Sequence, residues 1–134
     1  MKTLYVVYDD NNSLTELYEQ LVRASPNYNV IATVDPYKAL DMATNARPGP
    51  HLLITGLLKD ARMTGPGLIR KVHELGSRIK FILCSEHNES ELSSVMEELR
   101  NVGIDIRYIK FSDVTHPRVP DEGLAALVKS ILGE

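Results

Sequence analysis

Five short apolar runs alternate with longer stretches of helical periodicity, and this alternation limits the possible folds more than any other feature of the chain. The first run, TLYVVY, is apolar on both faces, as a parallel strand covered by helices on both sides must be. Strand and helix then alternate to the end of the chain, which favours right-handed crossovers. The predicted fold is α/β, a doubly wound five-stranded parallel sheet with five helices on its two faces. Its strands are predicted at residues 3–8, 28–34, 51–55, 79–85 and 104–109.

Capping residues predict where three of the helices begin. Ser13 and Glu16 have the spacing of a capping box, and the apolar residues that follow them indicate one buried helical face. Asp35, followed by a proline, predicts the start of a second helix, and Asp121 that of the last. The buried face of the first helix is predicted to contain Leu14, Leu17, Tyr18, Leu21 and Val22.

Composition indicates one soluble domain over residues 1–134, with 43% hydrophobic and 25% charged residues. No apolar run approaches the roughly 18 residues of a membrane span, and the N-terminus becomes acidic early, so a cytoplasmic protein is expected. The single cysteine, Cys84, excludes an internal disulfide. A net charge of -3 argues against nucleic acid as a partner.

The carboxyl ends of the predicted strands carry most of the polar residues that could form a site. Asp9 and Asp10 follow the first strand, and Ser85 and Lys110 end the fourth and fifth. In open parallel sheets, functional residues collect at this edge, so these side chains are expected to lie close together. An acidic pair before a helix is, by itself, most often solvated or favourable to the helix dipole.

This set of residues resembles the receiver (CheY-like) domains of bacterial response regulators. The stretches that carry the resemblance are VVYDDNNS, FILCSE, YIKF and the run from Val34 to Ile54. It implies a flavodoxin-like sheet with strand order 2-1-3-4-5. It also implies an acidic pair that helps to hold Mg²⁺, a Ser or Thr that senses the phosphoryl group, and a Lys, matching Asp9 with Asp10, Ser85, and Lys110.

The phosphoacceptor position of the resembled family lacks a carboxylate in this chain. Aligning HLLIT with the family's third strand places Gly56 there, and a shift of one residue would place Thr55 or Leu57 there. The nearest acid, Asp60, lies four residues further on. An acyl phosphate needs a carboxylate nucleophile, so ordinary phosphorylation is not expected. Gly56→Asp is expected to restore a response to a phosphoryl mimic if the pocket is otherwise intact.

Two further departures affect the fifth strand. Arg107 stands where the family usually has the aromatic residue whose rotation reports phosphorylation, and Phe111 replaces a proline after Lys110. Phe111 is predicted to fill a hydrophobic site. Lys110 is expected to offset the charge of Asp9 and Asp10, either as a structural cluster or as a site with weak Mg²⁺ affinity.

The leading functional hypothesis is a pseudo-receiver, not an enzyme, that signals through protein contacts without phosphorylation. The resemblance implies a partner or homodimer surface on the fourth helix, fifth strand and last helix, with candidates Glu97, Arg100, Arg107, Tyr108 and Lys129. One alternative is a Mg²⁺-dependent switch phosphorylated at an unusual residue such as Asp60. Another is a small flavodoxin-like enzyme or nucleotide binder, although Asp9 and Asp10 disfavour an anion there. The segment 111–120 is expected to form a loop, either for binding or mobile.

Overall fold

A five-stranded parallel sheet runs through the centre of the protein. The computed structural model describes residues 2–46, 49–59, 62–76, 78–115 and 123–134. The strand order is β2-β1-β3-β4-β5, so the predicted topology is confirmed. The strands are β1 (Lys2–Val7), β2 (Tyr28–Thr33), β3 (Leu52–Thr55), β4 (Lys80–Ser85) and β5 (Ile106–Lys110).

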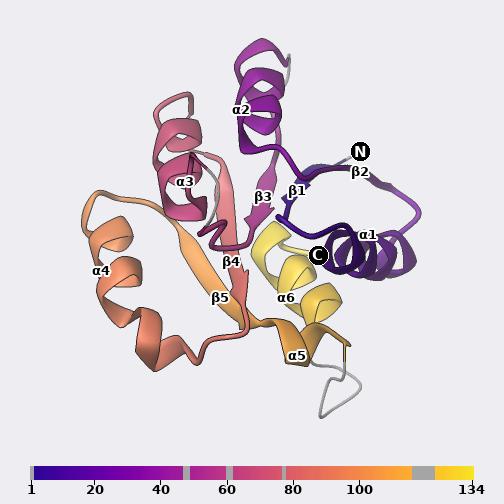
Figure 1. Cartoon of the computed structure of the whole chain (residues 1–134). Coiled ribbons are helices and arrows are strands. Elements are labelled where there is room, and N and C mark those ends of the chain that lie inside the picture. The colour runs from indigo at the N-terminus through magenta and orange to yellow at the C-terminus, as the bar shows by residue number, and fades with distance from the viewer. Residues whose placement is uncertain (1, 47–48, 60–61, 77, 116–122) are drawn as a thin grey trace.

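Helices cover both faces of this sheet (Figure 1). On one face lie α2 (Pro36–Asn45), α3 (Gly65–His73) and α4 (Ser93–Asn101), the last preceded by the 3-10 helix η1 (Glu89–Leu92). The other face is covered by α1 (Asn11–Ala24), α5 (Phe111–Thr115) and α6 (Leu124–Leu132). Strands β1, β3 and β4 contribute alternate residues to the two apolar cores, which explains why their sequences are apolar throughout.

The first helix begins earlier than its capping box predicted. Its N-cap is Asp10, whose side chain accepts from the backbone N–H groups of Asn12 and Ser13, so the prediction of a cap at Ser13 is wrong. At the N-cap position, a carboxylate accepts hydrogen bonds from the free backbone N–H groups of the first turn as well as a serine hydroxyl does. The buried face of α1 is also narrower than predicted, because Tyr18 and Val22 are 40% and 44% exposed.

The expectation of five helices is wrong by one, since the described residues form six α-helices. The additional helix, α5, occupies the first half of a segment expected to be a loop. Its Val114 is buried against the core beneath α1 and α6, and this burial stabilises one helical turn where the local pattern is weak. The predicted cap Asp121 lies outside the described residues.

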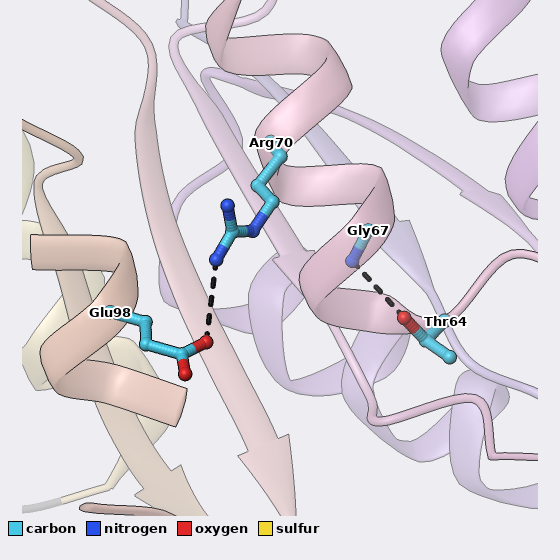
Figure 2. A network of polar contacts seen from close by, with 4 residues as sticks. All are labelled: Thr64, Gly67, Arg70 and Glu98. Atoms are coloured by element: carbon cyan, nitrogen blue, oxygen red, sulfur yellow. Dashed lines mark hydrogen bonds and ion pairs between the residues drawn. The ribbon is translucent and has the colours of Figure 1, made fainter. Parts of the chain in front are cut away.

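Helix α3 is positioned by a cap and by an ion pair to its neighbour. Figure 2 shows Thr64, whose hydroxyl accepts from the backbone N–H of Gly67 at 3.1 Å, and Arg70, whose guanidinium lies 3.4 Å from the Glu98 carboxylate of α4. The ion pair is solvent-exposed and therefore weak. Among the described helices, none is both long and apolar enough to cross a bilayer.

Candidate functional site

The carboxyl ends of β1, β3 and β4 meet around one shallow cavity. Val7 pairs with Thr55 and Thr55 with Leu83, which brings three strand ends to the same level of the sheet. The cavity has a volume of about 230 Å³. It is lined by Tyr8, Asp9, Leu57, Leu58, Lys59, Ser85, Glu86 and His87. The sequence predicted Asp9 and Ser85 in this place but not Tyr8, Lys59 or His87.

Neither residue at the end of β3 presents a free nucleophilic side chain to the cavity. Thr55 is completely buried, and its hydroxyl donates to the carbonyl oxygen of Gly56 at 2.9 Å. Gly56 has no side chain, and its N–H donates to the carbonyl of Val7 at 3.0 Å, which extends the pairing of β1 with β3. The backbone here is thus held tightly without presenting a nucleophile to the cavity.

The space beside Gly56 is filled by the ring of Tyr8. A Cβ atom built on Gly56 would lie 2.9 Å from Cε2 and 3.0 Å from Cδ2 of that ring. A side chain at position 56 would therefore require the Tyr8 ring to shift, and a restored response in Gly56→Asp stays a prediction. Tyr8 in turn lies near Phe111, with ring centroids 5.6 Å apart and planes inclined by 46°. Phe111 does pack against an apolar cluster, as predicted.

Asp10 is directed to its own helix. One carboxylate oxygen accepts from the hydroxyl of Ser13 at 2.5 Å and from its backbone N–H at 3.0 Å, and the other accepts from the N–H of Asn12 at 3.3 Å. These hydrogen bonds, that of the Ser13 hydroxyl above all, lower the pKa of Asp10. The shift thus arises from capping and not from a nearby ammonium group.

Lys110, which was expected to offset the charge of Asp9 and Asp10, has its hydrogen-bond partner on another loop. Its Nζ donates to the side-chain oxygen of Asn88 at 3.1 Å, on the loop after β4. Within the described part of the chain no ion pair joins it to Asp9 or Asp10. A different lysine approaches the cavity, because Nζ of Lys59 lies 3.1 Å from Nε2 of His87. Lysine can only donate, so this His87 nitrogen is the acceptor.

Ser85 belongs to a closed ring of hydrogen bonds with Tyr108 and His87. The His87 backbone N–H donates to the Ser85 hydroxyl at 3.1 Å, and that hydroxyl lies 3.1 Å from the Tyr108 hydroxyl. The Tyr108 hydroxyl donates to the backbone carbonyl oxygens of His87 and, at 3.2 Å, of Ser85. Its one proton is thus used, so the Ser85 hydroxyl must be the donor to Tyr108. Burial raises the pKa of Tyr108, which keeps its proton available.

Arg107, the residue aligned with the family's aromatic position, is exposed on β5. The following residue, Tyr108, is the one whose side chain reaches Ser85. Side chains alternate across a strand, so one step along β5 changes the face of the sheet. Tyr108 lies with Ile106 against the core formed under α3 and α4. The sequence did contain a signal for this role, because Tyr108 is the only aromatic residue of β5.

The loop after β3 is tightly folded over the strand end. A Cβ atom on Gly65 would lie only 1.9 Å from the carbonyl oxygen of Gly56, and the Gly65 N–H donates to the Leu57 carbonyl at 2.7 Å. Leu58 has a φ of 55°, a left-handed conformation that is unusual for a branched side chain, yet it is 2% exposed. Burial of its side chain holds the backbone in this conformation.

The residues at the strand ends fit a Mg²⁺ site poorly. Both oxygens of Asp10 already accept hydrogen bonds, which leaves the exposed Asp9 as the free carboxylate of the acidic pair. Over the described ranges, no group of three or more His, Cys, Asp or Glu side chains could hold a metal ion. Asp60, the alternative phosphoacceptor, lies outside these ranges. Since Mg²⁺ gives up its waters reluctantly, one or two exposed oxygens provide little affinity.

The predicted interaction residues come from α4, β5 and α6. Glu97 and Arg100 line a cavity of about 620 Å³ beside α4, with Met96 at its base. Arg100 also donates to the carbonyl of Ile106 at 3.2 Å, which links α4 to β5. Lys129 is exposed on α6, the helix that covers the opposite face of the sheet (Figure 1).

Comparison with known proteins identifies the fold. No family model matches the chain, and no curated protein matches its sequence. Solved structures do match over nearly its whole length. A response regulator receiver domain protein from Clostridium thermocellum is 14% identical, with a TM-score of 0.74, and the match covers 99% of this chain and 95% of that one.

Two further structures agree with that match. The BeF3-activated DrrB receiver domain is 21% identical, with a TM-score of 0.74 and coverage of 100% of this chain and 99% of that one. A CheY-like receiver domain protein from Methanospirillum hungatei is 23% identical, with a TM-score of 0.71 and coverage of 99% and 92%. The protein therefore has the fold of the response regulator receiver (CheY-like) domains.

Proposed function

We propose that this protein is a receiver-type module of two-component signalling that acts through protein contacts and accepts no phosphoryl group. The single observation that carries the proposal is the end of β3, where a receiver fold presents a buried Thr55 and a Gly56 covered by an aromatic ring. A carboxylate is needed both to attack phosphorus and to complete a Mg²⁺ site. The chain keeps the scaffold of the switch without its reactive group.

The polar network around Ser85 supports a fixed signalling surface. In the proposed state the Ser85 hydroxyl is already satisfied by Tyr108 and His87, so it needs no phosphoryl oxygen as a partner. The Tyr108 side chain joins β5 to the loop that leads into α4. Partners are proposed to bind the surface of α4, β5 and α6, with Glu97, Arg100, Arg107, Tyr108 and Lys129 as contact residues. A second copy of the chain is one such partner.

The competing functions receive less support from the site. A nucleotide would place its phosphates at the N-terminus of α1, where the Asp10 carboxylate already accepts from the free amides. This argues against a nucleotide-binding enzyme. The net charge of -3 argues against nucleic acid, and we propose a cytoplasmic location in keeping with a signalling role.

The proposal is tested by incubating the unmodified protein with Mg²⁺ and acetyl phosphate, and separately with Mg²⁺ and beryllium fluoride. We expect an unchanged mass and unchanged backbone amide resonances for Asp10, Ser85 and Lys110. Mg²⁺ alone is the control for simple ion binding. Addition of one phosphoryl group to the intact protein would contradict the proposal, and loss of that addition in Asp60→Asn would assign it to the alternative switch.

A further inference from the structure

The ring of Tyr8 occupies the space beside Gly56 at the strand-end cavity. Its ring covers Gly56 closely enough that even a methyl group would meet Cε2 at 2.9 Å, below ordinary van der Waals contact. The φ angle of Gly56 is not in the left-handed region, so its backbone would accept an L side chain. The obstacle to a side chain at this position is therefore the Tyr8 ring itself.

Several contacts keep the ring in this place. Tyr8 follows directly after β1, and its backbone N–H donates to the carbonyl of Thr33 on β2 at 3.4 Å. The ring packs against the core under α1 and α6 and lies 5.6 Å from the ring of Phe111, the first residue of α5. Burial, with the nearby Asp9 and Glu86 carboxylates, raises the pKa of Tyr8, so its hydroxyl is neutral.

We propose that Tyr8 is a built-in occupant of the acceptor position, and that its ring connects the ends of β3 and β5 through Gly56 and Phe111. This inference rests on the proposed function, because it interprets the strand ends as an acceptor site that has lost its carboxylate. The ring fills the volume that an acceptor side chain would need. Two substitutions, at Tyr8 and at Gly56, are therefore required to place a side chain in the site.

The test is a double-mutant cycle for thermal unfolding, with Gly56→Asn as the probe side chain. Asparagine has the shape of aspartate without its charge, so the probe reports on space and not on repulsion by Asp9. Overpacking of this kind lowers Tm by roughly 5 to 10 °C for a domain of this size. We expect Gly56→Asn to lower Tm by this amount in the unmodified protein. In the Tyr8→Ala background, the same substitution should lower Tm by less than about half as much.

Two matched variants separate the ring from other effects. Tyr8→Phe keeps the ring without the hydroxyl, so the full loss caused by Gly56→Asn should return there. Tyr37→Ala removes a tyrosine that is 49% exposed on α2, and it should relieve nothing. If Tyr8→Ala does not fold, Tyr8→Val removes the ring with a smaller loss of volume and serves the same purpose.

An equal loss of Tm for Gly56→Asn with and without the Tyr8 ring would overturn the inference. So would a Gly56→Asn variant as stable as the unmodified protein, because the acceptor position would then be empty. Neither result concerns phosphorylation, so the inference can fail while the proposed function stands. Conversely, phosphorylation at Asp60 would contradict the proposed function and leave the result of the cycle unchanged.

Discussion

Removing the hydroxyl of Tyr108 should separate β5 from the loop after β4 at a measurable cost. In Tyr108→Phe the backbone carbonyls of His87 and Ser85 lose the donor that they share, and the Ser85 hydroxyl loses its acceptor. Ser85 is only 4% exposed, so water replaces the missing partner poorly. A hydrogen bond contributes about 0.5 to 1.5 kcal/mol, and a buried group left without its partner costs more. For two bonds at a half-buried site we expect a loss of about 1 to 3 kcal/mol in the free energy of unfolding.

Urea denaturation of the variant measures this loss, and the midpoint should fall without a change of slope. Tyr37→Phe is the matched control, because within the described structure its exposed hydroxyl makes no hydrogen bond. Ser85→Ala should cost less in the Tyr108→Phe background than in the unmodified protein, since the two side chains share one bond. If Tyr108→Phe and Tyr37→Phe differ by less than about 0.5 kcal/mol, the ring of hydrogen bonds does not contribute as argued.

Two further substitutions test the helix start and the loop that frame the cavity. Asp10→Asn should keep the cap of α1 and Asp10→Ala should lose it. Because capping lowers the pKa of Asp10, its stabilisation is present above about pH 4 and is lost as the pH falls through the lowered value, so the Tm of Asp10→Asn should decline less over this acid range. A Tm as high for Asp10→Ala as for Asp10→Asn would refute the capping role. Gly65→Ala should cost on the order of 3 kcal/mol, because its methyl group would overlap the Gly56 carbonyl oxygen at 1.9 Å. Gly67→Ala is the control, because its methyl group would meet side chains alone, that of Thr64 at 3.2 Å and that of Met63 at 3.8 Å. Equal unfolding energies for the two variants would contradict the close approach.

Helix α5 illustrates the limit of local sequence patterns. Five residues provide too little periodicity to predict a helix, and an isolated turn is unstable in water. The turn forms because Val114 is buried in a core made by α6 and by α1, a helix from the other end of the chain. Tyr18 and Val22 show the opposite error, because the sequence predicted them to be buried and they are exposed. The apolar face of α1 is wider than the part of the helix that packs against the sheet.

The order of the strands, the residues at their ends and the lack of a carboxylate at the end of β3 can all be read from the amino-acid sequence. These are properties of local order, because strands buried on both faces must be apolar throughout and a glycine has no nucleophile. Three features required the folded structure: the position of the Tyr8 ring, the contact of Tyr108 rather than Arg107 with Ser85, and the hydrogen bond from Lys110 to Asn88. These contacts join residues that are distant along the chain: Lys110 and Asn88 are 22 positions apart, and Tyr108 and Ser85 are 23 positions apart. Packing in three dimensions selects them, because each side chain settles where volume and hydrogen bonds are both satisfied.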